Sequence, residues 1–193
     1  MPHPVTRFRS WLREAAKAGA PLPEAMVLAT VDGRGRPSAR WVLLKEAGKR
    51  GFVFFTNAGS RKGGELSANP NAALAFYWDA TGRQVRVEGR AKLLPAAEAD
   101  AYWASRPSGS RWASAASDQS RPIASWARLL QRYAELAEQY PDGSIPRPPH
   151  WKGYVVVPRA IEFWTRREPR LHERELFTAT RDPEQWKRVI LQP

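Results

Sequence analysis

Two apolar periodicities divide the chain into predicted helices and predicted strands. A helical spacing predicts an N-terminal surface helix within residues 1–22 that ends near Gly19. Its apolar positions are Phe8, Trp11, Leu12, Ala15 and Ala16. The same spacing predicts helices at 95–105 and 123–140, so residues 95–140 form a helical insertion.

Shorter apolar or alternating runs, bounded by turn residues, predict strands in the rest of the chain. These runs lie at 25–31, 37–44, 51–56, 72–78, 83–94, 153–157, 160–164 and 186–191. The glycine-rich stretch from Asp32 to Pro37 predicts a tight turn, so the first two strands form a hairpin. Short strands with tight turns indicate a β-rich α+β fold of the barrel type, and no shift in composition divides residues 1–193 into more than one domain.

Composition narrows the possible chemistry. The chain has no cysteine, which excludes disulfides, thiolate metal sites and a cysteine nucleophile, and its 3 histidines are too scattered to suggest a metal site. The longest apolar run, from Ala72 to Trp78, is far shorter than the roughly 18 residues that a membrane-spanning helix needs. The first residues contain no apolar stretch of the kind found in secretory signals, so we expect a cytoplasmic protein without a membrane segment.

The charge is strongly positive, with a formal net charge of +12. A surplus of this size is compatible with nucleic-acid binding, with general polyanion affinity or with a solvated basic surface. Many of the cations, however, lie between Arg36 and Lys62 and alternate with predicted strands instead of forming a basic tail. This placement favours a shaped anion pocket and gives no expectation of a nucleic-acid partner.

The segment from Thr56 to Lys62 joins a predicted strand to a predicted helix. Ser60, Arg61 and Lys62 would bring a hydroxyl, two cations and the free amides of a helix start together, which suits a phosphate group. The alternative is that Ser60 only caps the helix while both cations face water.

Other polar residues lie on or beside predicted strands. Arg40 and Lys45 are five positions apart, so a regular strand would aim them at opposite faces, and each is equally compatible with an exposed edge charge. Gln84 can donate and accept hydrogen bonds to a ligand with a mixed polar edge, or it can face solvent. Trp164 is equally well explained as a core residue.

The helical insertion contains a second candidate anion site. Tyr102 and Arg106 are four apart and share a helical face, and Ser110 is expected in the loop that follows. Gln119 and Ser120 lie in a polar connection before the next helix, where Ser120 could be an N-cap.

The most diagnostic pattern is Arg170-Leu-His-Glu-Arg174. On an extended strand, Arg170, His172 and Arg174 would point to one side, which suits an anionic ligand. The alternative is a charged strand whose cations are balanced by Glu173 or Glu175.

These motifs together resemble the pyridoxine/pyridoxamine 5'-phosphate oxidase family, and the resemblance runs from about Phe8 to Pro193. It implies an FMN-binding split β-barrel of six or more antiparallel strands with peripheral helices. It also implies a homodimer with FMN at the subunit interface. The activity implied is oxidation of pyridoxine 5'-phosphate or pyridoxamine 5'-phosphate to pyridoxal 5'-phosphate, with oxygen reduced to hydrogen peroxide.

The resemblance assigns most of the motif residues to FMN: Arg40, Trp41, Val42, Leu43, Leu44, Lys45, Phe55, Thr56, Ser60, Arg61, Lys62, Gln84, Gln119, Ser120, Trp164 and Arg174. It assigns to the phosphorylated substrate Lys45, Tyr102, Arg106, Ser110, Arg170 and His172. Arg170 and His172 are the candidate catalytic residues, and His172 would either assist a proton movement or orient the substrate ring.

Several positions depart from the family pattern on the substrate side. Arg111 adds a cation beside the presumed phosphate clamp, Phe55 stands where tyrosine is common, and Thr165 to Arg170 replaces a glycine-containing turn. Three alternatives therefore remain: an FMN oxidase of another reduced ring, such as a dihydrophenazine, a non-catalytic flavin- or B6-binding protein, and, on charge alone, a nucleic-acid-binding protein.

Overall fold

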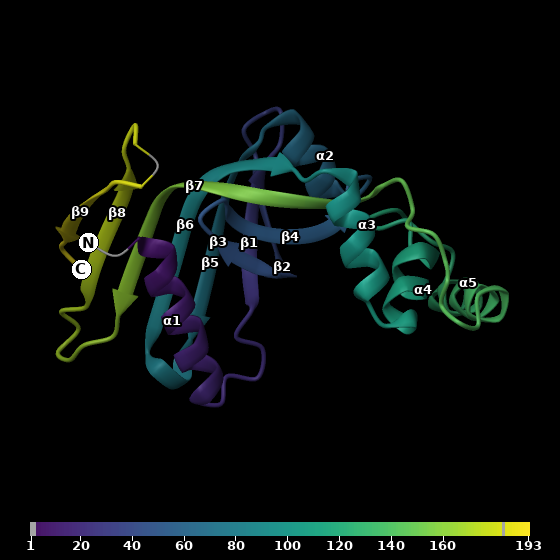
Figure 1. Ribbon diagram of the computed structural model, residues 1–193, viewed down its shortest axis with the longest axis horizontal. Coiled ribbons are helices and arrows are strands. Elements are labelled where there is room, and N and C mark those ends of the chain that lie inside the picture. Colours follow the sequence, from purple (N-terminus) through teal and green to yellow (C-terminus); the bar gives the residue numbers. More distant parts are fainter. Residues whose placement is uncertain (1–2, 183) are drawn as a thin grey trace.

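One curled antiparallel sheet organises the computed structural model, which describes residues 3–182 and 184–193. Its strands follow the order β2-β1-β5-β6-β7-β4-β3, and β8 and β9 extend the sheet from β7 (Figure 1). Their bounds are β1 Ala25–Val31, β2 Pro37–Leu43, β3 Glu46–Gly48, β4 Gly51–Asn57, β5 Asn71–Trp78, β6 Arg83–Leu93, β7 Trp151–Thr165, β8 Glu173–Ala179 and β9 Trp186–Leu191. The predicted β-rich barrel architecture is confirmed.

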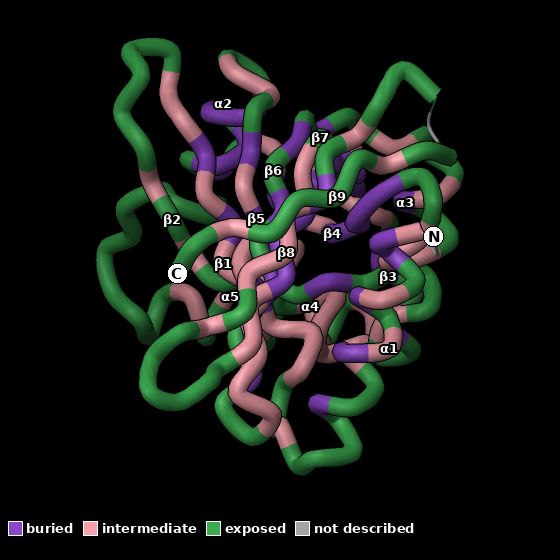
Figure 2. The backbone as a smooth tube through the Cα atoms, turned by 90° about the vertical axis from the view of Figure 1, so that its left-hand side faces the viewer, coloured by how far each residue is buried: buried purple, intermediate pink, exposed green. Residues whose placement is uncertain are grey.

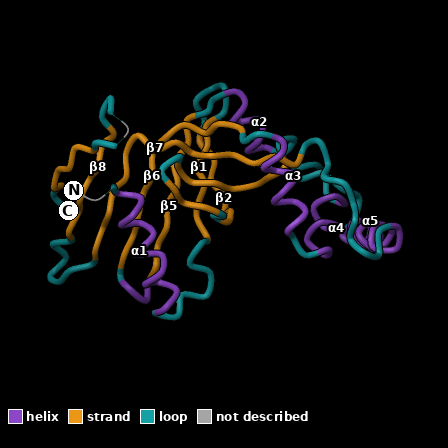
Figure 3. The backbone as a smooth tube through the Cα atoms, in the orientation of Figure 1, coloured by secondary structure: helices purple, strands orange, loops and turns teal. Residues whose placement is uncertain are grey.

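The helices lie around this sheet (Figure 3). They are α1 Pro4–Lys17, α2 Arg61–Ala68, α3 Ala96–Ser105, α4 Ser108–Ala116 and α5 Trp126–Gln139, with a short 3-10 helix η1 at Asp79–Thr81. Helices α3, α4 and α5 project together from one end of the sheet, whereas α1 packs along its middle (Figure 1). These three helices fall within the span predicted as a helical insertion.

Alternation along the strands forms the main core. Strands β1, β5 and β6 bury every second residue, and α1 covers the curled sheet by inserting Phe8 against Phe52 and Phe76, with ring centroids 4.9 and 4.8 Å apart. Figure 2 shows the buried positions gathered at the centre of the molecule. A smaller cluster that includes Trp103 and Trp151 joins α3 to the start of β7.

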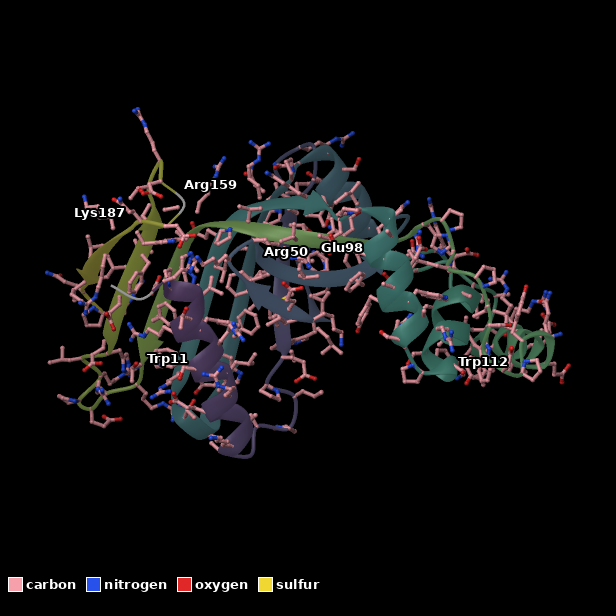
Figure 4. All side chains as sticks on the ribbon, viewed as in Figure 1. Trp11, Arg50, Glu98, Trp112, Arg159 and Lys187 are labelled. Carbon is pink, nitrogen blue, oxygen red and sulfur yellow. The ribbon has the colours of Figure 1, made fainter. Side chains whose placement is uncertain are left out.

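An ion pair fastens α3 to the β3–β4 hairpin. Arg50 lies in the hairpin turn, and its Nη1 is 2.6 Å from Oε2 of Glu98 near the start of α3 (Figure 4). The helical end of the molecule is therefore connected to the sheet by polar as well as apolar contacts.

The observed elements differ from the predicted ones at several places. The strands expected at 153–157 and 160–164 are one strand, β7, because the ladder with β6 continues past Pro158 through a register shift at Glu88/Gly89. A β-carbon on Gly89 would lie 2.2 Å from the carbonyl oxygen of Val157, so only glycine permits this close approach. Helix α4 and the short strand β3 were not predicted.

No helix of the described residues is long and apolar enough to cross a membrane. The same residues contain no cluster of three histidine, aspartate or glutamate side chains arranged to hold a metal ion.

Candidate active site

A cavity of about 630 Å³ lies between the sheet and the helical end of the molecule. Its walls come from the end of β2, from β4, from α2 and from α3 and α4. Eleven of the predicted site residues line it: Trp41, Val42, Leu43, Lys45, Phe55, Thr56, Lys62, Tyr102, Arg106, Ser110 and Gln119. The structure thus brings together residues that are spread over a large part of the sequence.

Lys62 forms one charged end of the cavity. Its buried Nζ donates to three uncharged oxygens, Thr56 Oγ1 at 3.0 Å, Ser60 Oγ at 3.1 Å and Gln119 Oε1 at 2.6 Å. Burial, with a further contribution from the Arg40 charge, lowers the pKa of the Lys62 ammonium to about 8. A buried cation with only neutral partners is suited to an anionic ligand.

The start of α2 supports this end of the cavity. Ser60 is the N-cap, and its Oγ accepts from the Gly63 N–H at 3.4 Å while donating to the Asn57 carbonyl at 2.6 Å. A β-carbon on Gly63 would lie 2.2 Å from the Ala58 carbonyl oxygen, so this glycine lets the helix approach the preceding loop. Both interpretations of Ser60, cap and phosphate neighbour, are compatible with this geometry.

Arg40 and Arg61 do not line the cavity, because both are bound to the buried Glu65 carboxylate. Arg40 Nη2 lies 3.0 Å from Glu65 Oε2, and Arg61 Nε lies 2.8 Å from Oε1. Burial alone would raise the pKa of Glu65, but hydrogen bonds from Thr30, Ser38 and the two arginines outweigh it and lower the pKa to about 2. Leu44 is a core residue, and Ser120 is likewise not a lining residue.

Arg106 forms the other charged end, in the region predicted as a substrate clamp. Its Nη1 donates to Ser114 Oγ at 3.0 Å, and its guanidinium lies over the Trp103 and Trp151 rings at 5.2 and 5.0 Å. Burial lowers the pKa of Arg106, and the nearby Arg111 charge adds to this effect. Arg106 is the C-cap residue of α3, directly after the turn that carries Tyr102.

An aromatic wall joins the two charged ends. The rings of Phe55 and Tyr102 are stacked with centroids 4.1 Å apart, and Trp151 continues the stack 5.1 Å from Phe55. Ser110 lines the cavity from the first turn of α4, so the expectation that it lies in a loop is wrong. The cause is a helix of small residues that carries little apolar periodicity.

Four other predicted residues form a separate cluster, in which Gln84, Trp164 and Arg174 lie on β6, β7 and β8 and His172 directly precedes β8. Gln84 is the register partner of Trp164, which in turn pairs with Arg174 on β8. The Trp164 and His172 rings are 4.6 Å apart. Arg174 Nε donates to the buried carboxylate of Glu162 at 2.7 Å, and this hydrogen bond raises the pKa of Arg174.

Arg170 and His172 do not lie on a strand, because β8 begins only at Glu173. Arg170 has a φ of +86°, so the extended geometry predicted for Arg170, His172 and Arg174 is wrong. The Arg167 N–H donates to Nδ1 of His172 at 3.1 Å. The neutral imidazole therefore carries its proton on Nε2 and offers that atom as a hydrogen-bond donor.

The two clusters lie at opposite ends of one strand. Trp151, at the start of β7, lines the cavity, whereas Trp164 lies thirteen residues further along the same strand. At the rise of a β-strand this separation is about 40 Å, and Figure 1 shows the length of β7 between α3 and β8. None of the residues of the second cluster lines the cavity of its own chain.

Two acidic residues of the site were missed by sequence reasoning. Glu65 and Glu162 are buried and hold the guanidinium groups of Arg40 and Arg174. A signal for Glu162 existed, because it stands between apolar residues of a predicted strand, where a carboxylate needs a cationic partner.

Comparison with known proteins shows which family this sequence matches. Residues 12–142 match the family described as pyridoxamine 5'-phosphate oxidase, and residues 151–193 match the pyridoxine 5'-phosphate oxidase C-terminal dimerisation region. A pyridoxine/pyridoxamine 5'-phosphate oxidase of Paraburkholderia phytofirmans is 53% identical over 99% of this chain and 89% of its own length. A protein of the same name from Thermosynechococcus vestitus is 52% identical over 98% of this chain and 89% of its own length.

Solved structures share the fold. PhzG of Burkholderia lata 383, crystallised with tetrahydrophenazine-1-carboxylic acid, has a TM-score of 0.94 and 34% identity over 100% of this chain and 94% of its own. A pyridoxamine 5'-phosphate oxidase-related, FMN-binding protein of Nostoc punctiforme has a TM-score of 0.76 at 18% identity, over 96% of this chain and 97% of its own, and supports the fold alone. The match over most of the sequence, together with relatives that are more than half identical, shows that the chain belongs to the pyridoxine/pyridoxamine 5'-phosphate oxidase family.

Proposed function

We propose that the protein is an FMN-dependent oxidase that converts pyridoxine 5'-phosphate and pyridoxamine 5'-phosphate to pyridoxal 5'-phosphate. The observation that carries this proposal is the cavity with two cationic ends, Lys62 and Arg106, joined by an aromatic wall. Two separate phosphates, one on the cofactor and one on the substrate, would match these ends. Relatives named for the same activity cover nearly the whole chain.

FMN fits the Lys62 end. A phosphate there would provide the negative charge that the three neutral oxygens around Nζ do not, and Ser60 and the first amides of α2 would add hydrogen bonds. Arg40 and Arg61, held by Glu65, would contribute positive potential from the side of α2. Trp41, Val42, Leu43, Lys45, Phe55, Thr56 and Gln119 would line the rest of the cofactor site.

A homodimer would complete the site. The second cluster, with Gln84, Trp164 and Arg174, does not line the cavity of its own chain, and most of it lies in the segment that matches a dimerisation region. We infer that each cavity receives this cluster, together with Arg170 and His172, from the partner chain. FMN would then be bound at the subunit interface.

The residues of the chain bind and orient the substrate. Arg106, Tyr102 and Ser110 would hold the substrate phosphate, and Lys45 would lie where the cofactor and the substrate meet. His172 would donate a hydrogen bond from Nε2 and, in this tautomer, would not remove a proton with that atom. When bound, FMN supplies the acceptor for the hydride equivalent that leaves C4' of the substrate, and oxygen then accepts the electrons as hydrogen peroxide.

A second candidate function is favoured by the similarity to PhzG, whose structure contains a tetrahydrophenazine carboxylate. A carboxylated ring could also use Arg106 as its anion partner. The higher identity to the pyridoxine/pyridoxamine 5'-phosphate oxidases, 53% against 34%, favours the phosphorylated substrate.

The test is aerobic turnover by the purified, FMN-loaded protein. We expect pyridoxal 5'-phosphate, followed by absorbance, in many-fold excess over enzyme from pyridoxine 5'-phosphate, with an equal amount of hydrogen peroxide. Turnover of a dihydrophenazine carboxylate alone would favour the second candidate. Bound FMN without turnover of either substrate would indicate a flavin-binding protein and contradict the oxidase.

A further inference from the structure

The loop between β7 and β8, residues 166–172, adopts a conformation that other contacts must maintain. Arg170 has a φ of +86°, a left-handed backbone geometry that residues with a β-carbon rarely adopt. Its N–H donates to the Arg167 carbonyl at 3.0 Å, which closes a tight turn. This turn determines where Arg170 and His172 lie.

Arg166 fastens the start of this loop to the β5–β6 connection. Its N–H donates to the Gly82 carbonyl at 2.8 Å, and its Nη2 lies 2.9 Å from Asp79 Oδ1. The same Nη2 donates to Tyr77 Oη, and this hydroxyl donates to Asp79 Oδ1 at 2.8 Å. The three side chains therefore form a closed triangle of hydrogen bonds, which we call the Arg166 triangle.

Arg167 connects this fastened part of the loop to His172 by hydrogen bonds. Its N–H bonds His172 Nδ1, and its guanidinium bonds both oxygens of Glu173 at 3.1 and 3.2 Å. The Trp164 ring also contacts the imidazole, with ring centroids 4.6 Å apart. Because Arg166 and Arg167 are adjacent, a shift of the Arg166 backbone would move the amide that fixes His172.

We propose that Arg166, through Asp79 and Tyr77, is a positioning residue for Arg170 and His172. This inference rests on the proposed function, in which Arg170 and His172 contact the substrate. The triangle touches neither the FMN cavity nor its lining residues. The triangle is solvent-exposed, so its contribution to the free energy of unfolding is small. We expect it to change mainly the fraction of molecules in which the loop has the observed conformation.

The experiment compares Arg166→Ala, Asp79→Asn and Arg166→Lys with Arg181→Ala, a matched exposed arginine in the β8–β9 connection. Arg166→Ala and Asp79→Asn should raise the KM for pyridoxine 5'-phosphate about fivefold, with a smaller change in kcat and an unchanged Kd for FMN. Arg166→Lys should recover part of the loss because it keeps the charge. The Arg166→Ala, Asp79→Asn double variant should be no worse than either single variant, since both disrupt one triangle.

A second readout needs no substrate. Amide hydrogen exchange at Arg166, Arg167 and Arg170 should become about fivefold faster in Arg166→Ala, while exchange in β4 and α2 stays the same. Unchanged exchange, or an unchanged KM with faster exchange, would overturn the positioning role. If the wild-type protein does not oxidise pyridoxine 5'-phosphate, the proposed function fails. The exchange comparison then still tests whether the Arg166 triangle maintains the conformation of the loop.

Discussion

At the scale of single residues, Lys62 is the side chain whose protonation should depend most on a bound ligand. It is buried, its pKa is lowered to about 8, and its hydrogen-bond partners are uncharged oxygens. A phosphate would bind the protonated form and raise this pKa again, because an opposite charge favours the ammonium. Binding of the cofactor should therefore be linked to the protonation of one lysine.

This linkage predicts a pH dependence for FMN affinity. Below pH 8 Lys62 is already protonated in the free protein, so the phosphate contact is fully available; as the pH rises through 8 a proton must be taken up on binding. The Kd for FMN should increase about tenfold between pH 7 and pH 9. Fluorescence titration of the FMN-stripped protein measures it.

Lys62→Arg provides the matched control, because the arginine keeps its charge at every pH in this range. Its Kd for FMN should be nearly independent of pH between 7 and 9. An equally steep dependence in the arginine variant would assign the pH effect to another group.

At the scale of elements, the junction between β4 and α2 depends on one of two adjacent glycines. A β-carbon at Gly63 would lie 2.2 Å from the Ala58 carbonyl oxygen, whereas one at Gly64 would meet nothing within 4 Å. Gly63→Ala should destabilise the protein by about 1–3 kcal/mol, as overpacking does, and weaken FMN binding by displacing the start of α2.

Gly64→Ala should be neutral or stabilising by up to about 1 kcal/mol, since alanine is the better helix former. Thermal unfolding and FMN titration of both variants check the pair. Equal effects of the two substitutions would show that the close contact at Gly63 does not control the cofactor site.

Most elements were predictable because each has a local signal. Strands β1 and β9 match their predicted limits, since their apolar runs end at turn residues. Helix α4 was missed because serine and alanine dominate it, and β7 was divided because Pro158 and Arg159 interrupt its apolar pattern. The extended geometry expected for Arg170 and His172 was wrong because the loop before β8 depends on contacts with Tyr77, Asp79 and Gly82, which are distant in sequence.

The sequence allowed most residues of the candidate site to be named, but not their positions relative to one another in space. The motifs named both cationic ends of the cavity, Lys62 and Arg106, because cations beside predicted strands and helices are visible in the sequence. Sequence spacing could not show that Arg40 is bound by Glu65, or that Trp164 lies about 40 Å along β7 from the cavity. Both facts depend on tertiary pairing.

At the scale of the whole molecule, the separation of the two clusters predicts complementation between inactive subunits. Arg106→Ala removes a residue of the cavity, and His172→Ala removes one from the distant cluster. In a mixed dimer of these two variants, one of the two shared sites contains both defects and the other contains none.

Each variant alone should be nearly inactive, and random mixing of equal amounts should restore about a quarter of the wild-type activity, because half of the dimers are mixed and each has one intact site. Differently tagged, purified mixed dimers should show about half of the wild-type activity, and their turnover measures the one intact site directly. Mixed dimers without activity would contradict a site built from two chains.

The unneutralised charge of Lys62 also has a consequence for how much of the protein persists in a cell. Without a bound anion, the folded state must tolerate a desolvated ammonium that the unfolded chain leaves in water. FMN relieves this cost and adds binding energy, amounting to about 2.7 kcal/mol when free FMN is at a hundred times its Kd. FMN supply would thereby influence the abundance of the protein as well as its catalytic capacity, because molecules without cofactor would unfold more often and be degraded first.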